Sequence, residues 1–382
     1  MMWHMHETAA GTRFLFTSYI ALSNRKPPCK INLGQPQSVC RAPARKHPAT
    51  EKKAVLFRGR NMKMNKGLIA AAMAASLLST PAMALDMGAT DKTIKLAINE
   101  WTGQHLSTRV AGAILERAGY AVEYVTAGYG PQFIALGEGD LHATMEIWTS
   151  NAPGQFGEAE SAGKVVDIGD LGLAAREGVL YPIHMKEVCP GLPSWEALNA
   201  CADKFASVET LPNGRLLDYP ADWGSPGKDR FEAMGMNFTA VPAGSEGALI
   251  TELEASIAKK SPLVMTFWQP HWALAEYETE WVALPAGTDD CYSDPAWGVN
   301  KTATGDCDFS PTRIFKVTWA GFGDTWPAAN DILANYTLDA NSQQLMMAAV
   351  DGRGEDIDAV VAGYIDANAS AVDSLISAAK SR

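Results

Sequence analysis

The sequence lacks the motifs that hydrolases and nucleotide-binding enzymes commonly carry. It has no P-loop and no His-Glu-x-x-His pair, and Gly244–Gly247 lacks the Gly-x-Ser-x-Gly spacing of a nucleophile elbow. Histidines are scarce after residue 84, where they stand singly at His105, His142, His184 and His271. Because such scattered residues favour neither a metal site nor a catalytic base, we predict a protein that is not an enzyme and needs no cofactor.

The sequence also lacks the long apolar run that a membrane span needs. The apolar run over residues 67–78 is short, follows the basic segment Met62–Lys66 and precedes the small-residue segment Ala82–Ala84. That order predicts a secretory signal peptide over residues 62–84, cleaved after Ala84, and hence a periplasmic protein. Because a signal peptide normally begins the chain, we interpret residues 1–61 as a non-native upstream extension. An unusually long basic leader is the alternative.

Basic residues are few beyond that segment. Residues 1–84 contain 13 Lys and Arg and two acidic residues, which leaves 19 basic and 41 acidic residues in 85–382. So acidic a chain argues against nucleic acid and anionic membranes as partners, because both attract basic surfaces. The charge balance fits a soluble secreted protein.

Cysteine is rare, and four cysteines follow the predicted cleavage site: Cys189, Cys201, Cys291 and Cys307. An even number in an oxidising compartment predicts disulfides. Nearest-neighbour pairing, Cys189 with Cys201 and Cys291 with Cys307, would close two surface loops, although the sequence permits three pairings. The aspartates around Cys291 and Cys307 raise the alternative of a Ca²⁺ site, but their spacing is not that of an EF-hand, and we favour a solvated loop.

The rest of the chain alternates between short apolar strands and helices. Strands are predicted at residues 94–100, 121–126 and 143–148, with helices at 106–118 and 133–136 between them. This alternation predicts an α/β fold in which right-handed crossovers build a mostly parallel sheet. The length after cleavage suits two such domains.

Two crossings are expected to join these domains. We place domain I at residues 88–182 and 299–382, and domain II at residues 183–298. The apolar segment Val179–Ile183 is expected to cross into domain II, and Trp297–Lys301 is expected to cross back. Two crossings would let the halves hinge.

Tryptophan is abundant, and short apolar runs predict two further strands, at residues 216–220 and 261–266. Four tryptophans stand at or just after predicted strand ends: Trp101, Trp148, Trp223 and Trp268. Ligands of open α/β sheets bind at the carboxyl ends of the strands, so these four predict one shared aromatic cage. Trp272 is expected to support the cage from behind. The remaining tryptophans are expected to pack in the core: Trp195, Trp281, Trp297, Trp319 and Trp326.

The residues around these tryptophans resemble those of a known family. Trp148-Thr149, Trp223-Gly224 and Thr266–Trp268 with Pro270 and Trp272 look like the glycine betaine/choline substrate-binding proteins of ABC importers. The resemblance extends from residue 92 to the C-terminus and rests on the order and spacing of these segments. It implies a two-domain periplasmic-binding-protein clamshell, a Trp cage around a methylated ammonium, and delivery of the solute to an ABC permease in the inner membrane.

An aromatic cage suits the chemistry of a quaternary ammonium. Such a group cannot donate hydrogen bonds, and its charge spreads over nearly spherical methyl surface. Aromatic faces contact the methyl groups and attract the cation through their quadrupoles, Trp most strongly. We therefore expect a periplasmic solute-binding protein, a monomer, with glycine betaine as the leading ligand.

A betaine carboxylate would need hydrogen-bond donors in the same site. The resemblance implies that backbone amides of Gly224 and Ser225 form an anion nest beside the cage. Some relatives place a His four positions after the first cage Trp, where this chain has Ala152, so we expect Asn151 to substitute.

Acidic residues near the cage point to other ligands. Glu146 stands two residues before Trp148, hence on the same expected strand face, and Glu100 and Asp222 are also close in sequence. A pocket carboxylate would favour a cation without an acid group, so choline and trimethylamine N-oxide are alternatives. Carnitine, which carries a carboxylate like glycine betaine, is a further alternative ligand. A periplasmic enzyme with Glu146 or Asp222 as a base, and a sensor-linked binding protein, are the rival classes.

Overall fold

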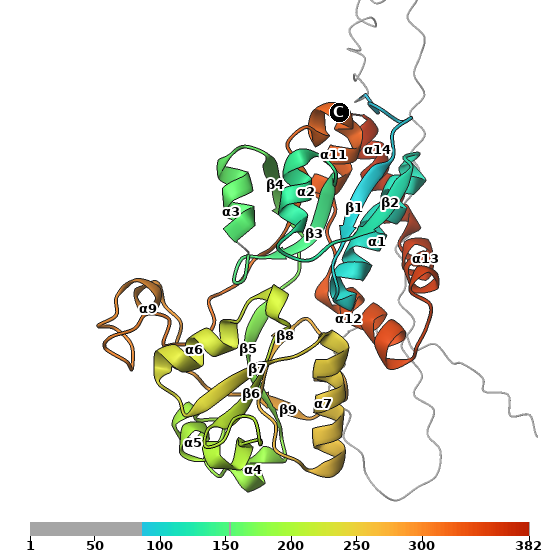
Figure 1. The fold of residues 1–382 in the computed structure, drawn as a ribbon. Coiled ribbons are helices and arrows are strands. Elements are labelled where there is room, and N and C mark those ends of the chain that lie inside the picture. The colour runs from blue at the N-terminus through green and yellow to red at the C-terminus, as the bar shows by residue number, and fades with distance from the viewer. Residues whose placement is uncertain (1–85, 153, 382) are drawn as a thin grey trace, which may run out of the picture. The chain divides into compact units, whose positions relative to one another are not determined.

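The computed structural model describes residues 86–152 and 154–381 (Figure 1). The predicted signal peptide at 62–84 and the predicted extension at 1–61 lie outside the described residues. None of the helices in the described part has the length and apolar character that crossing a bilayer requires. Two five-stranded sheets with flanking helices build the described part.

The first sheet has the strand order β2-β1-β3-β10-β4. Its strands are β1 (Ile94–Ile98), β2 (Val122–Thr126), β3 (Ala143–Trp148), β4 (Val165–Asp170) and β10 (Ile314–Trp319). β1 pairs in parallel with β2 and β3, whereas β10 runs antiparallel to β3 and β4. The helices that accompany this sheet are α1 (Thr102–Ala118), α2 (Gln132–Glu138), α3 (Gly154–Ser161), α10 (Phe322–Thr325), α11 (Pro327–Asn335), α12 (Ala340–Met347), α13 (Ile357–Ala367) and α14 (Ala369–Lys380). We call sheet and helices together the first lobe.

The second sheet has the order β7-β6-β8-β5-β9. Its strands are β5 (Arg176–Pro182), β6 (Gly214–Asp218), β7 (Phe238–Pro242), β8 (Met265–Gln269) and β9 (Thr279–Trp281). β6 is parallel to β7 and β8, and β5 is antiparallel to β8 and β9. Its helical segments are α4 (Met185–Val188), α5 (Trp195–Ala200), η1 (Ala202–Phe205), η2 (Ala221–Trp223), α6 (Pro226–Met234), α7 (Glu246–Lys259), α8 (Ala273–Glu276) and α9 (Asp289–Ser293). This is the second lobe.

The two-sheet α/β architecture agrees with the prediction, but both sheets are mixed rather than mostly parallel. The segment expected to cross between the domains, Val179–Ile183, forms most of β5 in the second sheet, since Leu180 pairs with Met265 of β8. The chain therefore passes between the sheets before Arg176, not after residue 182. It returns through β10, a strand that the sequence reading missed, because Trp297–Lys301 forms turns rather than a strand. The apolar pattern of a strand does not depend on the sheet that it joins. The sequence therefore indicated neither the sheet of β5 nor the return of the chain through β10.

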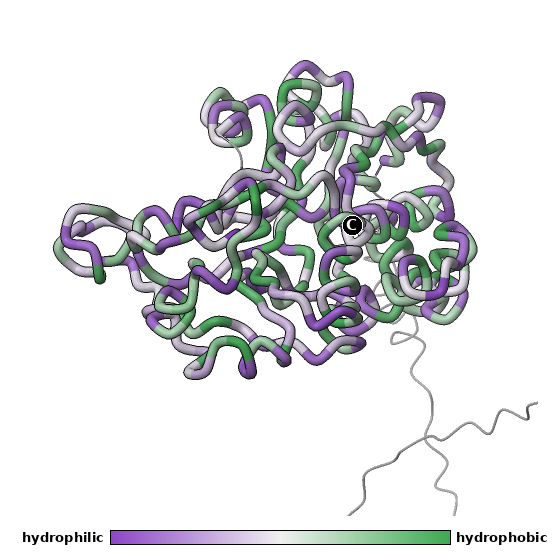
Figure 2. The backbone as a smooth tube through the Cα atoms, turned by 60° about the horizontal axis from the view of Figure 1, so that its bottom comes forward, coloured by the Kyte–Doolittle hydropathy of each residue, from purple (hydrophilic) through white to green (hydrophobic). Residues whose placement is uncertain are grey.

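Helix boundaries follow local signals that the sequence displays. Gly119 ends α1 in the left-handed conformation with φ 107°, which suits glycine. Ser245 caps α7 by accepting from the amide of Ala248. Of the C-terminal helices, α11 packs on β4, whereas α12, α13 and α14 pack on α1. Figure 2 shows hydrophobic and hydrophilic residues alternating along the tube near the C-terminus, as expected of amphipathic helices. A five-residue π-helical segment, η3 (Ala348–Gly352), follows α12.

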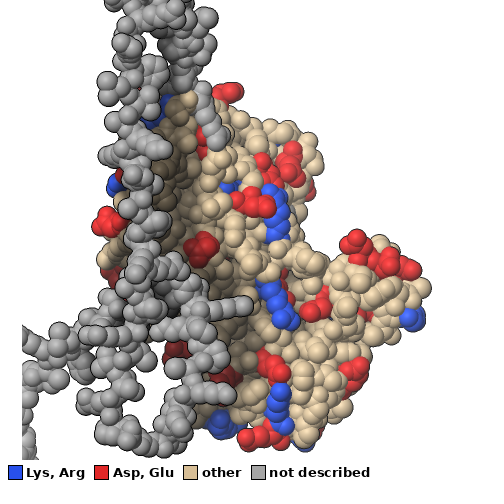
Figure 3. All heavy atoms as spheres, turned by 180° about the vertical axis from the view of Figure 1, so that it is seen from behind, with Lys and Arg blue, Asp and Glu red and all other residues tan. Residues whose placement is uncertain are grey.

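The strands at the centre of the first sheet are buried on both faces. Every residue of β3 is buried, and four of the five residues of β1 are buried as well. Helices on both sides of a sheet produce this pattern, which accounts for the nearly continuous apolar runs in the sequence. On the face seen from behind in Figure 3, acidic side chains form separate patches with basic side chains between them.

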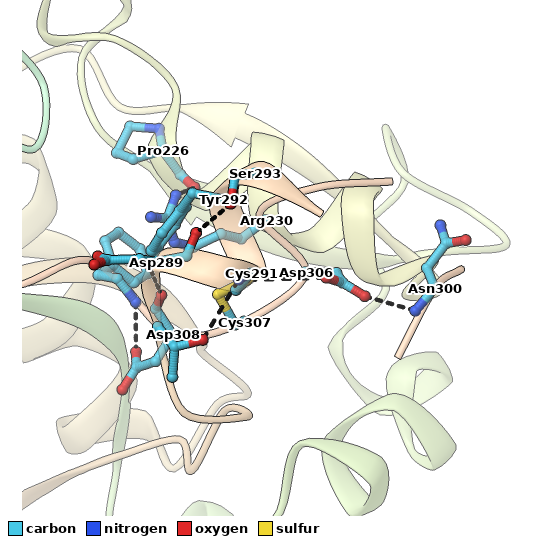
Figure 4. The surroundings of a disulfide bond; sticks show 12 residues. Pro226, Arg230, Asp289, Cys291, Tyr292, Ser293, Asn300, Asp306, Cys307 and Asp308 are labelled. Carbon is cyan, nitrogen blue, oxygen red and sulfur yellow. Dashed lines mark hydrogen bonds between the residues drawn. A yellow bond between two sulfur atoms is a disulfide. The ribbon is translucent and has the colours of Figure 1, made fainter. Parts of the chain in front are cut away.

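The cysteines pair as nearest neighbours, as predicted. Cys189 bonds to Cys201, and Cys291 bonds to Cys307. In Figure 4 the second disulfide lies in the long loop that precedes β10, where the amide of Asn300 donates to Asp306 at 2.6 Å. Within the described residues, no group of three or more His, Cys, Asp and Glu side chains is arranged to hold a metal ion.

The same loop packs on the second lobe. The Arg230 guanidinium of α6 lies over the Phe309 ring, 4.3 Å from its centre, and faces Tyr292 at 5.8 Å. Asn300 donates its side-chain amide to the carbonyl of Ala233 at 2.7 Å. The loop therefore belongs with the second lobe up to the point where the chain returns.

Removing the second disulfide should loosen this loop. A closed loop of about 15 residues contributes about 3 kcal/mol by restricting the unfolded chain. We expect the Cys291→Ser, Cys307→Ser double variant to lose about that much free energy of unfolding in urea titration. Peptide mapping without reductant should find both nearest-neighbour links, and a Cys201–Cys291 link or free thiols would contradict the pairing.

Candidate functional site

Eight described residues from both lobes line one cavity with a volume of about 310 Å³, part of which is open to solvent. The first lobe contributes Trp101, Tyr129, Trp148 and Asn151. The second lobe contributes Glu177, Tyr219, Trp223 and Trp268. All four tryptophans expected to form a cage therefore meet on a single cavity.

Strand geometry brings these side chains together. Trp101 follows β1 and stands at the N-cap of α1, and Trp148 is the last residue of β3. Trp223 ends η2, shortly after β6, and Trp268 lies in β8. Because β1 is parallel to β3, and β6 is parallel to β8, each pair of strands delivers its carboxyl ends to one sheet edge.

The rings meet mostly edge to face. Trp101 and Trp223, from opposite lobes, have centroids 5.3 Å apart and planes inclined by 66°. Trp223 and Trp268 lie 5.6 Å apart at 80°, and Tyr219 lies within 5.8 Å of both. The four tryptophans are at most 6% exposed. This packing fixes several aromatic faces and edges around one small volume.

Glu146 does not line the cavity, contrary to the expectation from its position two residues before Trp148. It accepts hydrogen bonds from the Trp101 indole at 2.7 Å, from Ser107 at 2.6 Å and from Gln343 at 2.7 Å. Burial raises the pKa of Glu146 to about 7, and these donors oppose the rise. Glu146 thus holds Trp101 in place from behind the cavity.

A β-bulge explains the misplaced prediction. Pairing between β3 and β10 jumps from Thr144↔Val317 to Ile147↔Phe315, so two residues of β3 face Lys316 alone. Glu146, with φ 62°, is one of these two. A bulge breaks the two-residue alternation, so a position two residues before Trp148 does not place Glu146 on the cavity. The Trp148 side chain still interacts with the Glu146 carboxylate.

The expected anion nest is not part of the cavity either. Neither Gly224 nor Ser225 lines it, and Ser225 donates its hydroxyl to Asp229 at 3.2 Å. The N-terminus of α6 is already occupied by the Asp218 carboxylate, which accepts from the amide of Lys228 at 2.7 Å. A Cβ at Gly227 would lie 2.7 Å from Asp218, so glycine permits this approach.

Asn151 lies on the cavity, as expected. Its side-chain amide donates to the carbonyl of Trp223 across the lobes at 3.3 Å, and its Oδ1 atom is buried without a partner. Among the described residues, the Trp223 indole N–H is buried without a partner too, and the buried Tyr219 hydroxyl interacts with the Glu177 carboxyl group. Buried polar groups of this kind favour a ligand that carries a complementary polar atom.

Three lining residues were not predicted: Tyr129, Glu177 and Tyr219. Tyr129 stands in the turn before α2 and its hydroxyl accepts from the amide of Trp148 at 3.0 Å. Tyr219 directly follows β6, so the signal that found the tryptophans, an aromatic residue after a strand, could have found it. Glu177 gives no such signal, because its strand was assigned to the wrong domain.

Glu177 is the acidic residue of the cavity. It is 3% exposed, it accepts a hydrogen bond from the Ser150 hydroxyl, and burial raises its pKa. No Lys, Arg or His is among the described residues that line the cavity. Asp222 is exposed and is not among the lining residues, so neither carboxylate considered as a catalytic base lies on it.

The tryptophans expected in the core do not line the cavity. Trp319 packs against Gly139 and Gly321 of the first lobe, and Trp326 donates to the carbonyl of Ala89 at 2.9 Å. Trp272 is 7% exposed and lies beside His271, whose ring contacts Trp268 at 4.9 Å. Trp272 therefore contacts the lining residue Trp268 only indirectly, through His271.

Comparison with known families decides the class of this protein. Residues 92–367 match the family model described as the substrate binding domain of the ABC-type glycine betaine transport system. The chain belongs to this family of transport substrate-binding domains. This confirms the resemblance drawn from the tryptophan segments.

A curated relative of this substrate-binding domain is the trimethylamine N-oxide-binding protein of Pelagibacter ubique (strain HTCC1062). The two are 29% identical over 292 residues, which span 74% of this chain and 91% of that protein. The match therefore includes nearly all of the relative.

Solved structures share the fold of this substrate-binding domain. A choline-binding protein of an ABC transporter, in complex with choline, superposes with a TM-score of 0.61 at 16% identity, over 75% of this chain and 92% of that one. Lactococcal OpuAC, closed around glycine betaine, gives 0.58 at 17% identity, over 75% of this chain and 100% of that one. The two-lobed clamshell is thereby confirmed.

Removing a cage ring should weaken binding sharply. A desolvated cation–π contact contributes about 2 kcal/mol, and about 1.4 kcal/mol corresponds to a tenfold change in affinity. We expect Trp148→Ala, Trp223→Ala and Trp268→Ala each to lower affinity about tenfold to thirtyfold in calorimetry. The probe is whichever of glycine betaine, choline and trimethylamine N-oxide the unaltered protein binds most tightly.

Trp319→Ala is the matched control for this series. It removes a partly buried tryptophan of the first lobe that does not line the cavity, so it should leave affinity unchanged even where it lowers the melting temperature. Unaltered binding by all three cage variants would mean that the ligand sits elsewhere.

Proposed function

We propose that this protein is the solute-binding component of an ABC importer and that its ligand is a small trimethylated amine without a carboxylate, trimethylamine N-oxide first. It binds the solute between its lobes and presents it to a permease in the inner membrane. It acts as a periplasmic monomer and performs no chemistry on the ligand.

The observation that carries the proposal is an aromatic cavity in which the one charged residue, among the lining residues that the structure describes, is an acid. Six aromatic residues surround the volume, and their faces attract a methylated cation without needing hydrogen bonds from it. Glu177 adds to that attraction whenever it is ionised. A methylated ammonium centre is therefore favoured over an uncharged group of the same size.

The polar groups of the cavity suit a single ligand oxygen. Trimethylamine N-oxide has one, the Trp223 indole N–H is a buried donor without a partner, and the Tyr219 hydroxyl beside Glu177 is a second buried donor. The protonated form of Glu177, favoured by the burial that raises its pKa, is a third donor. The relative named for trimethylamine N-oxide, which matches three quarters of the chain, supports the same ligand.

Glycine betaine, the leading ligand on sequence grounds, ranks lower on this geometry. Its carboxylate would enter a cavity that already contains Glu177, with Asp218 close enough to raise the pKa of Glu177 further. Like charges at this range oppose each other, and no basic side chain among the described lining residues compensates.

Choline is the second candidate, and one observation favours it. Ionised Glu177 can accept a hydrogen bond from the choline hydroxyl while it attracts the trimethylammonium group. The two ligands therefore require opposite protonation states of the same carboxyl group.

This difference gives a test by pH. Because burial raises the pKa of Glu177, the protonated donor persists to a higher pH than in a free glutamate and is lost as the pH rises through that pKa. Affinity for trimethylamine N-oxide should fall as pH rises, whereas affinity for choline should increase. Calorimetric titration from mildly acidic to mildly alkaline pH measures both slopes.

The variant Glu177→Gln should remove both slopes. Its amide remains a donor, so binding of trimethylamine N-oxide should change by no more than about threefold, while choline should lose about tenfold or more, which is about 1.4 kcal/mol. Glu276→Gln, on an exposed acid of the second lobe, is the control and should change neither. Tightest binding of glycine betaine by the unaltered protein would overturn the proposed ligand.

A further inference from the structure

The N-termini of α1 and α7 face each other across the two lobes. Thr102, the first residue of α1, donates its amide to the Glu246 carboxylate at 2.7 Å. Glu246, the first residue of α7, donates its own amide to the Glu100 carboxylate at 3.2 Å. Each helix therefore receives a carboxylate from the opposite lobe, and we call these two hydrogen bonds the cross-lobe caps.

The N-terminus of α1 has no hydrogen-bond acceptor from its own N-cap side chain. The first amides of a helix have no partner within it, and the positive end of the helix dipole attracts an anion. The N-cap residue of α1 is Trp101, whose side chain makes no cap. Glu246 supplies the missing acceptor, and it does so from the second lobe.

Additional contacts brace Glu246. His271, fully buried between the cage strand β8 and α8, lies with Nε2 3.0 Å from the second carboxylate oxygen of Glu246. Gln344 of the first lobe donates to the His271 carbonyl at 3.3 Å. Glu246 is itself only 6% exposed, so its carboxylate is held in one position.

The caps flank a cage residue. Glu100 and Thr102 are the chain neighbours of Trp101, whose ring contacts Trp223 of the second lobe. Fixing the residues on both sides of Trp101 to α7 fixes where its ring stands when the lobes are in contact. Separation of the lobes breaks both caps, because each joins one lobe to the other.

We propose that Glu246 and Glu100 are positioning residues for ligand binding, which place Trp101 against the second lobe and stabilise the lobes in contact. This inference rests on the proposed function, because it assumes that the cavity between the lobes binds the ligand. Neither residue touches that cavity. Their effect on affinity acts through Trp101.

The experiment is a double-mutant cycle measured by calorimetry. The probe is the tightest binder among trimethylamine N-oxide, choline and glycine betaine. Glu246→Ala should lower affinity about tenfold, which is about 1.4 kcal/mol, and Glu246→Gln should lower it less, since an acceptor oxygen remains. In a Trp101→Ala background the effect of Glu246→Ala should shrink to about threefold or less.

Two further measurements separate positioning from general stability. Glu116→Gln, on an exposed acid near the other end of α1, should leave affinity unchanged. The melting temperature without ligand tests folding, and small-angle scattering with saturating ligand should give a larger radius of gyration for Glu246→Ala than for the unaltered protein.

An unchanged affinity in Glu246→Ala, or the same loss of affinity with and without Trp101, would overturn the proposed positioning role of the cross-lobe caps. Neither result would contradict the aromatic cage. Failure of the unaltered protein to bind any of the three amines would instead overturn the proposed function. The two failures are therefore distinguishable.

Discussion

The site depends on one constraint: aromatic side chains from two separate sheets must meet around the same small volume. Trp101 and Trp148 leave the ends of β1 and β3, and Trp223 and Trp268 come from the β6 and β8 region. Neither lobe encloses the volume alone, since each contributes four of the eight lining residues. Burial of the cage therefore requires contact between the lobes.

The polar residues behind the cage serve this arrangement. Glu146 holds the Trp101 indole through a carboxylate that also accepts from Ser107 and Gln343. A buried carboxylate is costly unless donors surround it, and here three donors do so. Replacing any of them would leave a polar group unpaired, so the network stabilises one orientation of the ring. Among the described residues that line the cavity, Glu177 is the single acid, and its charge acts directly on a ligand.

Sequence reasoning found the parts of the site that depend on local pattern and missed those that depend on pairing. The four tryptophans stand at strand ends, which is visible in the chain, and the nearest-neighbour disulfides are close in sequence. Glu146 was misplaced because a bulge opposite Lys316 shifts the strand register. Glu177 was missed because β5 pairs with β8 of the second sheet, a choice made by tertiary packing. The fold class followed from alternation of strands and helices, whereas the mixed sheets arise from β10 and β5, whose partners are distant in sequence.

The central claim is that the cavity recognises positive charge through aromatic faces rather than apolar shape alone. Calorimetric comparison of choline with its carbon isostere 3,3-dimethylbutan-1-ol tests it most directly, because the two share size, shape and hydroxyl group but only choline carries a cationic centre. The account predicts that 3,3-dimethylbutan-1-ol binds at least about a hundredfold more weakly than choline, since several cation–π contacts of about 1 kcal/mol or more each are lost. Equal affinity for the two would show that the cavity is merely hydrophobic and would contradict the account.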